Sequence, residues 1–509
     1  MIAAAVAAAA ALAAAGVSCP LDGVGRGGRP DAWLRTTAAK VLAASTSPRC
    51  RLLGLAVLDR LDLHGEDACV AWRRLAAEPA DADLRALRGR LAWRCGQAVE
   101  AHRDALAALD EDPSSAAAWT LLGDVLAARF LDDAAAAAFD RALAIDADDP
   151  EALFARVGVT ASRSERRALL RRFVAAAHER GTTRQRLRAA LETLEFLEAL
   201  ADRDVFVVEK AELPGEIRLS PMVIRPGSIA GWIARIGVGE AGTLPALFDT
   251  GASGLHLDAR AAEKARLAPL SGVTLVGGGG SGEHAVRRGL LARLDLGPLV
   301  YRQALAVSAM DSLHPRGTYR AILGADLFAG TALTFDFPRR RLEVRDVPAQ
   351  ASATGDPRRV DPWPRDPDAL PLLRVAGMLL VPARLSAGTT TIERPLLFDT
   401  GASRTMIARA AAESFRGLRH GARRGARGYG GAMEVVGTLP RLTIDLGAAT
   451  GELRDVPVFD LSARTRVTGI NVGGFVGNDW LARRRVTLDL VRGVLVVAPD
   501  AGRRSGRRR

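Results

Sequence analysis

The spacing of hydrophobic residues divides the chain into two parts with different patterns. From about Asp31 to Ala201, apolar residues recur three and four positions apart, in sequence rich in Ala, Leu, Arg and Glu. This is the period of an amphipathic helix, so it predicts a helical region over 31–201. After about residue 203, short stretches rich in Val, Ile and Leu follow a period of two, with Gly and Pro between them. This second pattern predicts strands and turns.

One segment of the helical region resembles a tetratricopeptide repeat. Seven of its residues fall at the offsets of that repeat, between the pairs Asp112-Pro113 and Asp149-Pro150. One helix pair cannot bury its apolar faces alone, so we expect neighbouring helices over 84–109 and 151–171 to stack on it. The region is then either a docking surface for a protein partner or a helical brace that packs on the rest of the chain. The seven residues are Trp119, Leu122, Gly123, Leu126, Ala135, Phe139 and Ala142.

A repeated heptapeptide is the clearest signal in the strand-rich part. The segment 247–253 reads Leu-Phe-Asp-Thr-Gly-Ala-Ser, and the same letters recur at 397–403. Each copy follows strand-like sequence, and each precedes a glycine-rich stretch and then a closing apolar-apolar-Gly segment with a last strand. These matched blocks are 230–238, 277–282 and 321–337 around the first copy, and 378–385, 425–431 and 475–490 around the second. The order predicts one fold used twice.

These blocks together resemble one subunit of a retropepsin, in the pepsin and retropepsin superfamily of aspartic peptidases. The resemblance covers residues 215–345 and 370–498. It implies a multidomain chain of α plus all-β class, with two acid-protease β-barrel-like halves that form a pseudo-twofold pair behind the helical region. It also implies that Asp249 and Asp399 are the catalytic carboxylates, and that the chemistry uses neither a cofactor nor a metal.

The two aspartates have a physical reason to act together. Two carboxylates about 3 Å apart cannot both ionise, as the aspartic protease dyad illustrates, so the pair holds one acid and one base at the same time. The base takes a proton from a water between the carboxyls, the water attacks the peptide carbonyl, and the acid protonates the carbonyl oxygen. The sequence therefore predicts an aspartic endopeptidase with a peptide or protein substrate.

The residues after each aspartate have supporting roles in this interpretation. The resemblance implies that Thr250 and Thr400 hydrogen-bond across the dyad. Gly251 and Gly401 let the two backbones approach each other and offer N–H groups to the carboxylates without a Cβ in the way.

The glycine-rich stretches are expected to be flaps that close over a substrate bound as an extended strand. Gly278, Gly279 and Gly280 are the candidate substrate-binding residues of the first flap, and Tyr429 and Gly430 are those of the second.

The segment 346–369 is rich in Pro and charged residues and is interpreted as a linker between the halves. Its length allows the two halves of one chain to pair, and it leaves open pairing with the halves of a second chain. The basic stretch 499–509 is expected to be a disordered tail.

The N-terminal segment 1–18 is interpreted as a signal peptide, because 2–16 is an uncharged, Ala-dominated run of suitable length. The protein is then exported, and is periplasmic, envelope-anchored or secreted. Cys19 follows the predicted cleavage point and is a candidate lipid anchor. Cys50, Cys69 and Cys95 leave room for one or two disulfides whose pairing the spacing does not decide.

Composition and motifs argue against several other function classes. The 509 residues are 48% hydrophobic, which suits several cores, and the net charge of +12 comes almost wholly from arginine spread along the chain. We therefore predict no nucleic-acid partner. Gly277, Gly279 and Gly282 match the letters of a dinucleotide fingerprint, but no apolar helical stripe follows them. The histidines lack metal-ligand spacing and no serine lies in a nucleophile elbow. The alternative that remains is a non-catalytic scaffold that binds peptides with its repeats and its protease-like cleft.

Overall fold

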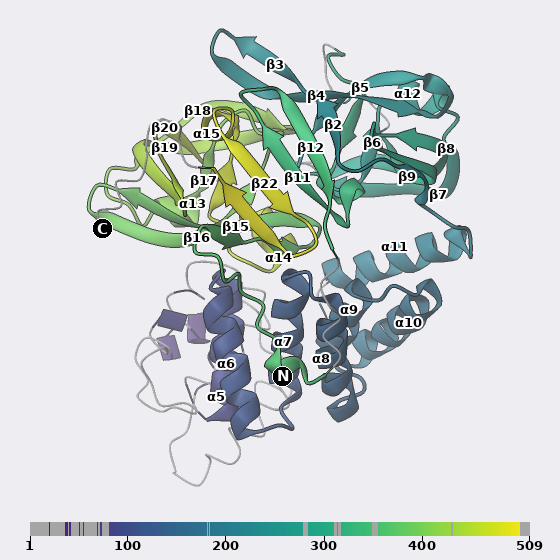
Figure 1. The fold of residues 1–509 in the computed structure, drawn as a ribbon. Helices are drawn as coiled ribbons and strands as arrows, with labels where there is room; N and C mark the ends of the chain where they lie inside the picture. The colour runs from purple at the N-terminus through teal and green to yellow at the C-terminus, as the bar shows by residue number, and fades with distance from the viewer. Residues whose placement is uncertain are drawn as a thin grey trace.

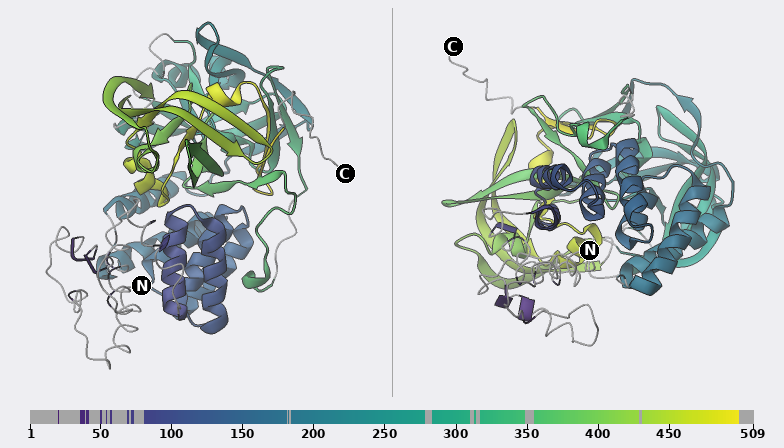
Figure 2. Two further views of the ribbon diagram at one scale, coloured as in Figure 1. Left: turned by 90° about the vertical axis from the view of Figure 1, so that its left-hand side faces the viewer. Right: turned by 90° about the horizontal axis from the view of Figure 1, so that it is seen from below.

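A computed structural model gives the fold of residues 20, 36–38, 40–41, 50, 54, 57, 69, 72–73, 81–180, 182, 184–277, 283–309, 313, 317–348, 355–428 and 431–498. A helical region is followed by β-rich sheets, so the expected α plus all-β class is confirmed. Figures 1 and 2 show the helices of the N-terminal helical region gathered on one side of the β sheets. The predicted signal peptide 1–18, Cys19 and the tail 499–509 lie outside the described residues.

The helical region is built from consecutive helices, three of which begin with a side-chain cap. Asp81, Ser115 and Asp149 each accept a backbone N–H at the start of a helix. Gly123 brings two of the helices close together, since a Cβ there would lie 2.4 Å from the Phe139 ring. The helices are α5 (Ala82–Arg94), α6 (Ala98–Glu111), α7 (Ala116–Ala128), α8 (Asp132–Ile145), α9 (Pro150–Gly158), α10 (Arg163–Arg180) and α11 (Arg184–Leu200).

The first β half surrounds the first heptapeptide with one sheet. Its order is β1-β9-β6-β10-β5-β4-β8-β7, with β3 paired to β4. β1 begins at Val207 and pairs with β9, so the sheet starts before the predicted boundary at 215. The elements are β1 (Val207–Ala211), β3 (Ser220–Arg225), β4 (Ser228–Val238), β5 (Thr243–Phe248), β6 (Leu255–Leu257), α12 (Ala259–Lys264), β7 (Ala268–Gly277), β8 (Glu283–Asp295), β9 (Leu299–Ala309) and β10 (Ala321–Leu323).

The second β half surrounds the second heptapeptide with a sheet whose strands resemble those of the first half. Its order is β14-β15-β16-β21-β17-β20-β19-β18. The elements are β14 (Leu373–Val375), β15 (Met378–Ala387), β16 (Thr390–Phe398), β17 (Met406–Ala408), α13 (Arg409–Ala412), β18 (Arg419–Gly428), β19 (Gly431–Leu446), β20 (Ala449–Phe459), α14 (Ser462–Thr468), β21 (Gly474–Val476) and α15 (Asn478–Leu481).

A third sheet takes strands from both halves and joins them within one chain. Its order is β13-β23-β22-β11-β12-β2, and the central pair, β11 and β22, is antiparallel. The strands are β2 (Gly215–Arg218), β11 (Thr331–Asp336), β12 (Arg341–Asp346), β13 (Ala369–Pro371), β22 (Arg485–Asp489) and β23 (Val494–Val497). The hydrogen bonds of this sheet therefore fix one half against the other.

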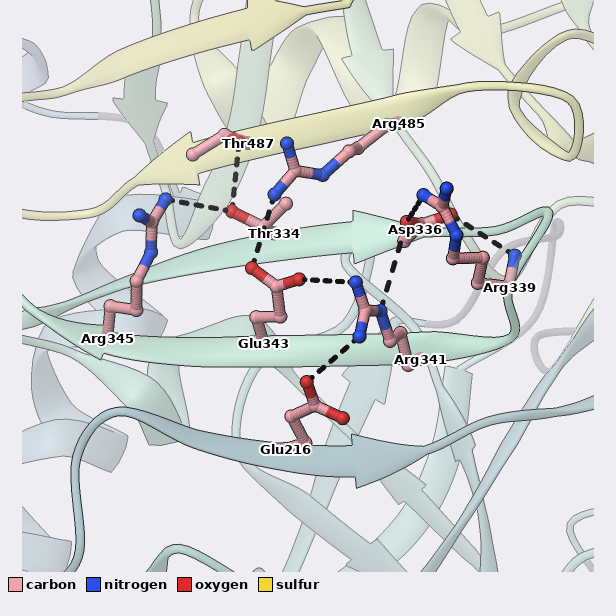
Figure 3. Close-up of polar contacts among 9 residues, drawn as sticks. All are labelled: Glu216, Thr334, Asp336, Arg339, Arg341, Glu343, Arg345, Arg485 and Thr487. Atoms are coloured by element: carbon pink, nitrogen blue, oxygen red, sulfur yellow. Dashed lines mark hydrogen bonds and ion pairs between the residues drawn. The ribbon is translucent and has the colours of Figure 1, made fainter.

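Side chains reinforce the junction in this shared sheet, as Figure 3 shows. The hydroxyls of Thr334 and Thr487 lie 2.9 Å apart across the central strand pair. The guanidinium of Arg485 donates to the carboxylate of Glu343 at 3.2 Å, and Arg341 also pairs with Glu343 at 3.1 Å. Because these ion pairs are partly exposed, the strand pairing and the bond between Thr334 and Thr487 contribute more to stability than the charges do.

The turn between α7 and α8 anchors the helical region to the β part. Arg129 in this turn is 2% exposed, and its guanidinium donates to the carbonyls of Pro362 at 2.8 Å, Leu372 at 2.5 Å and Gly493. Burial lowers the pKa of Arg129 to about 10, so the side chain stays charged at neutral pH. One side chain thus ties the turn to the segment between the halves, to the start of the second half and to the shared sheet.

Other contacts extend this interface. Trp363, from the segment between β12 and β13, donates to Nδ1 of His102 on α6 at 3.3 Å. Arg374 pairs with Asp132 on α8, and its guanidinium lies 4.8 Å from the ring centroid of Phe130. The helical region is therefore packed on the segment that was predicted to be a linker, as well as on the second half.

Cys69 and Cys95 form a disulfide at the end of α5. Within the portion of the chain that the structure describes, no helix is long and apolar enough to cross a membrane.

Candidate active site

The two repeated aspartates follow equivalent strands of the two halves. Asp249 comes directly after β5, which runs parallel to β10, and Asp399 comes directly after β16, which runs parallel to β21. The backbone N–H of Asp249 donates to the carbonyl of Leu323 at 3.0 Å, and that of Asp399 donates to Val476 at 3.1 Å. Each neighbouring strand thus holds the start of one aspartate loop.

Reciprocal hydrogen bonds join the two loops. The N–H of Thr250 donates to Oγ1 of Thr400 at 3.1 Å, and the N–H of Thr400 donates to Oγ1 of Thr250 at 3.1 Å. Each hydroxyl then donates to the carbonyl before the opposite aspartate, Thr250 to Phe398 at 2.6 Å and Thr400 to Phe248 at 2.8 Å. Both threonines are at most 1% exposed, so these bonds form in a dry environment where a lost partner is costly.

The glycines of the motif lie against the opposite carboxylates. A Cβ on Gly401 would lie 2.4 Å from Cγ of Asp249, and one on Gly251 would lie 3.1 Å from Cγ of Asp399. Only a residue without a side chain fits at Gly401 without displacing the aspartate. The glycine N–H groups also donate to the aspartate of their own loop, Gly251 to Asp249 at 2.8 Å and Gly401 to Asp399 at 2.9 Å.

Burial and proximity shift the acidity of both carboxyls. Burial raises the pKa of Asp249, against the bond from Gly251. Burial raises the pKa of Asp399 further, well above its usual range, and the negative charge of Asp249 adds to the effect. The positive charge of Arg464 opposes both shifts. Burial, together with the repulsion that Asp249 exerts on Asp399, therefore favours a protonated carboxyl in this pair.

A buried side-chain amide, that of Asn478, binds the backbone of the second aspartate loop. The sequence patterns did not predict this role. Asn478 is 2% exposed, and its Nδ2 donates to the carbonyls of Thr400 at 2.8 Å and Ala402 at 2.9 Å. Its Oδ1 accepts from Nε1 of Trp232, on β4 of the first half, at 2.7 Å. Ala325 takes the corresponding place after Gly324 in the first half. An asparagine in the second closing segment where the matched first segment has alanine is the sequence feature that could have pointed to this role.

The first loop has an ionisable neighbour, His256, that the second lacks at the matching place. Nε2 of His256 lies 2.9 Å from the carbonyl of Ser253, and burial lowers the pKa of this histidine, against the charges of Asp249 and Asp326. Met406 is the matching residue of the second loop. Asp326 accepts the N–H of Gly254 with both carboxylate oxygens, at 2.8 and 2.9 Å. His256 therefore lies in the electrostatic surroundings of the dyad.

Each half also has a long hairpin in the place expected for a flap. β7 pairs with β8 in the first half, and β18 pairs with β19 in the second. β8 is a strand, whereas a dinucleotide site would need a helix after the glycine-rich stretch. The predicted flap residues Gly278, Gly279, Gly280, Tyr429 and Gly430 lie outside the described residues.

A cavity of about 90 Å³ lies between the helical region and the first aspartate loop. Phe130 of the α7–α8 turn contributes to it from the helical side, and Thr250 and Ala252 contribute from the loop. The anchoring turn therefore reaches the surroundings of the threonine that joins the two loops.

A family model described as aspartyl protease matches residues 234–327. The matched stretch includes Asp249, and Asp399 lies beyond it. This match supports a protease-type function and thus a hydrolase. The chain is also similar to the crystal structure of the aspartic proteinase from Irpex lacteus, with 16% identity over 56% of this chain and 97% of that one, at a TM-score of 0.37. No curated protein matches the chain.

No group of His, Cys, Asp and Glu side chains with the arrangement of a metal site is found among the described residues. The polar groups that meet at the two loops are instead the carboxyls of Asp249 and Asp399, with backbone N–H groups directed at them. This arrangement can bind and activate a water by proton transfer.

Proposed function

We propose that the chain is an aspartic endopeptidase in which Asp249 and Asp399 activate a water together. The observation that carries this proposal is the reciprocal bonding of Thr250 and Thr400, which holds two identical aspartate loops face to face within one chain. The close approach of Gly401 to the Asp249 carboxylate supports it as well. A structural turn would need neither the second copy nor the contact between the loops.

The proposed reaction needs one proton on the pair. Since the pKa of Asp399 is raised further, we assign the proton mainly to Asp399 and the negative charge mainly to Asp249. The charged carboxylate takes a proton from the water as it attacks the peptide carbonyl, and the protonated carboxyl gives its proton to the carbonyl oxygen. The N–H groups of Gly251, Gly401 and Ala402 hold the carboxylates in place during this exchange.

We propose that the two β halves form a pseudo-twofold unit and that the substrate lies as an extended strand under the two hairpins. The shared sheet and the antiparallel pairing of β11 with β22 support pairing within one chain over pairing between chains. Under this proposal the helical region contains one tetratricopeptide-like repeat, α7 with α8, and acts as a brace. The buried contacts of Arg129 support that role.

Cleavage of a peptide library between pH 4 and 7 tests the proposed function. The full chain is compared with Asp249→Asn and Asp399→Asn, each with and without pepstatin. Asp455→Asn is a matched control, because Asp455 is an exposed aspartate of the second half with a positive φ of 49°, where asparagine fits well. We expect the wild type and the control to cleave, and both dyad variants to lose at least 10²-fold in kcat.

Folding of the dyad variants is checked by circular dichroism. If folded wild type cleaves nothing, or if Asp249→Asn cleaves as fast as wild type, the proposed function is wrong. The first result would favour a peptide-binding scaffold, and peptide binding without cleavage would identify it.

A further inference from the structure

Arg464 lies in helix α14, which follows β20 in the second half and ends at Thr468. Its guanidinium Nη1 contacts Sδ of Met378 at 3.6 Å. Met378 is the first residue of β15, and the carbonyl of the preceding Gly377 accepts from the hydroxyl of Ser253 at 3.1 Å. Ser253 is the last residue of the first heptapeptide. These contacts place Arg464 beside the junction between the first aspartate loop and the second half.

The charge of Arg464 also acts on the two catalytic carboxyls. It lowers the pKa of both Asp249 and Asp399, although burial outweighs it in each case. This long-range influence agrees with the position beside the first aspartate loop that the contact with Met378 gives to Arg464. His256 and Asp326 are titratable groups that also lie beside the first loop, and Arg374 lines the cavity next to Thr250.

Arg464 has no ion-pair partner among the described residues. Within the part of the chain that the structure describes, its side chain contacts the sulfur of Met378, which is a weak acceptor. The side chain is half-buried. By contrast, Arg374 pairs with Asp132, and Arg409 lies 3.7 Å from a carboxylate oxygen of Asp460. A half-buried arginine without a carboxylate, next to the groups that would hold the peptide bond, is ready to bind an anion from the substrate.

Strand β18 of the same half has charge of the same sign in its sequence. Strand β18 contains Arg419, Arg423, Arg424 and Arg427, and no Asp or Glu occurs between Glu413 and Glu434. An acidic substrate segment would therefore meet a favourable field on approach, in addition to a specific partner at Arg464.

We propose that Arg464 is a specificity-determining residue that pairs with an acidic side chain of the substrate. This side chain belongs to a residue next to the cleaved bond or to the residue one position further away. This inference rests on the proposed peptidase function. The substrate class is then a protein or peptide with Asp or Glu beside the cleavage site. The segment that follows helix α14 is tied to the helical region, since Asn471 donates its N–H to the carbonyl of Arg94 at 2.6 Å.

The test uses pairs of peptides that differ only by Glu against Gln at each position near the bond. The full chain is compared with Arg464→Gln, with Arg464→Lys and with Arg416→Gln, a control at an exposed arginine of the same half. We expect wild type to favour Glu at one position by about 10-fold or more in kcat/KM, the effect of a charge-assisted bond. Arg464→Gln should abolish that preference, Arg464→Lys should retain part of it, and Arg416→Gln should leave it unchanged.

The same peptide pairs are also made with a non-cleavable statine at the scissile position, and their Kd values are measured. An equal Kd for the Glu and Gln members with wild type overturns the specificity role, whether or not the protein cleaves. A preference that survives in Arg464→Gln overturns it too. If that variant instead cleaves all peptides more slowly and only its pH profile moves, Arg464 acts on the dyad alone. Failure of the proposed function is seen separately, as cleavage that does not depend on Asp249.

Discussion

Thr250 and Thr400 hold each other through both their main chains and their side chains. Each accepts the N–H of the other at 3.1 Å and donates its hydroxyl to a carbonyl of the opposite loop. Because both residues are buried, the four bonds form one cooperative contact between the halves. The geometry of the dyad therefore depends on residues that do not react.

Replacing Thr250 by valine should weaken this contact strongly. Valine keeps the shape of threonine but leaves the N–H of Thr400 and the carbonyl of Phe398 without partners, at a cost of about 1–3 kcal/mol per buried group. We expect a loss of about 3 kcal/mol in the free energy of unfolding, measured with urea, and a fall in kcat of at least 10-fold. Thr250→Ser is the control, because it keeps the hydroxyl. Equal stability of the valine and serine variants would contradict this account.

The raised pKa of Asp399 predicts how stability changes with pH. A carboxyl whose pKa is higher in the folded chain than in the unfolded chain stabilises the fold below the unfolded value, and this contribution is lost as pH rises. Asparagine has no such loss. The difference in Tm between Asp399→Asn and wild type should therefore be small at pH 4 and should grow in favour of the variant toward pH 7. Thermal unfolding across this range measures it.

Asp455→Asn serves as the control for that experiment, since it removes an exposed carboxyl from the same half. Its Tm should track the wild type at every pH. A constant difference between Asp399→Asn and wild type would show that the carboxyl is not perturbed by folding.

Arg129 should be the most sensitive residue of the helical region. Arg129→Met keeps an unbranched apolar chain but leaves the carbonyls of Pro362, Leu372 and Gly493 without their donor, which we expect to cost about 3 kcal/mol or more. Arg141→Met on α8 is the control, because Arg141 is exposed and should change stability by less than about 0.5 kcal/mol. Urea unfolding of the full chain compares them, and equal midpoints would contradict the anchoring role.

Much of the fold could be predicted because its pattern is local. The change of hydrophobic period near residue 203 marks the start of the β part, since helices and strands need different spacings to bury one face. The identical letters around Asp249 and Asp399 identified the two loops that meet. Their contact was predicted from the resemblance, because nothing local in a sequence says that two loops face each other.

The remaining parts of the site depend on contacts between distant segments. Asn478 bonds to Trp232, and Arg129 bonds to three carbonyls far along the chain. The chain has 70 basic residues, and nothing in the local sequence distinguishes an arginine that becomes buried from the others. Arg464 is similar, since α14 lies between two strands of the second half and its position beside the dyad arises only on folding.

The role of the Asn478 amide as a hydrogen-bond donor to the second loop can be tested by replacing it with an ionisable carboxyl. Asn478→Asp retains an acceptor for Trp232 but replaces the two N–H donors by a carboxyl that faces the carbonyls of Thr400 and Ala402. Ionisation of this buried carboxyl is unfavourable, so its pKa should rise above that in the unfolded chain, and the variant should lose stability as pH rises from 4 to 8. Asn478→Ala lacks an ionisable group and should be destabilised by about 3 kcal/mol at every pH. Urea unfolding of both variants across this range separates the two effects. Parallel pH profiles would mean that the new carboxyl reaches water, and that the amide is not needed as a donor to the loop.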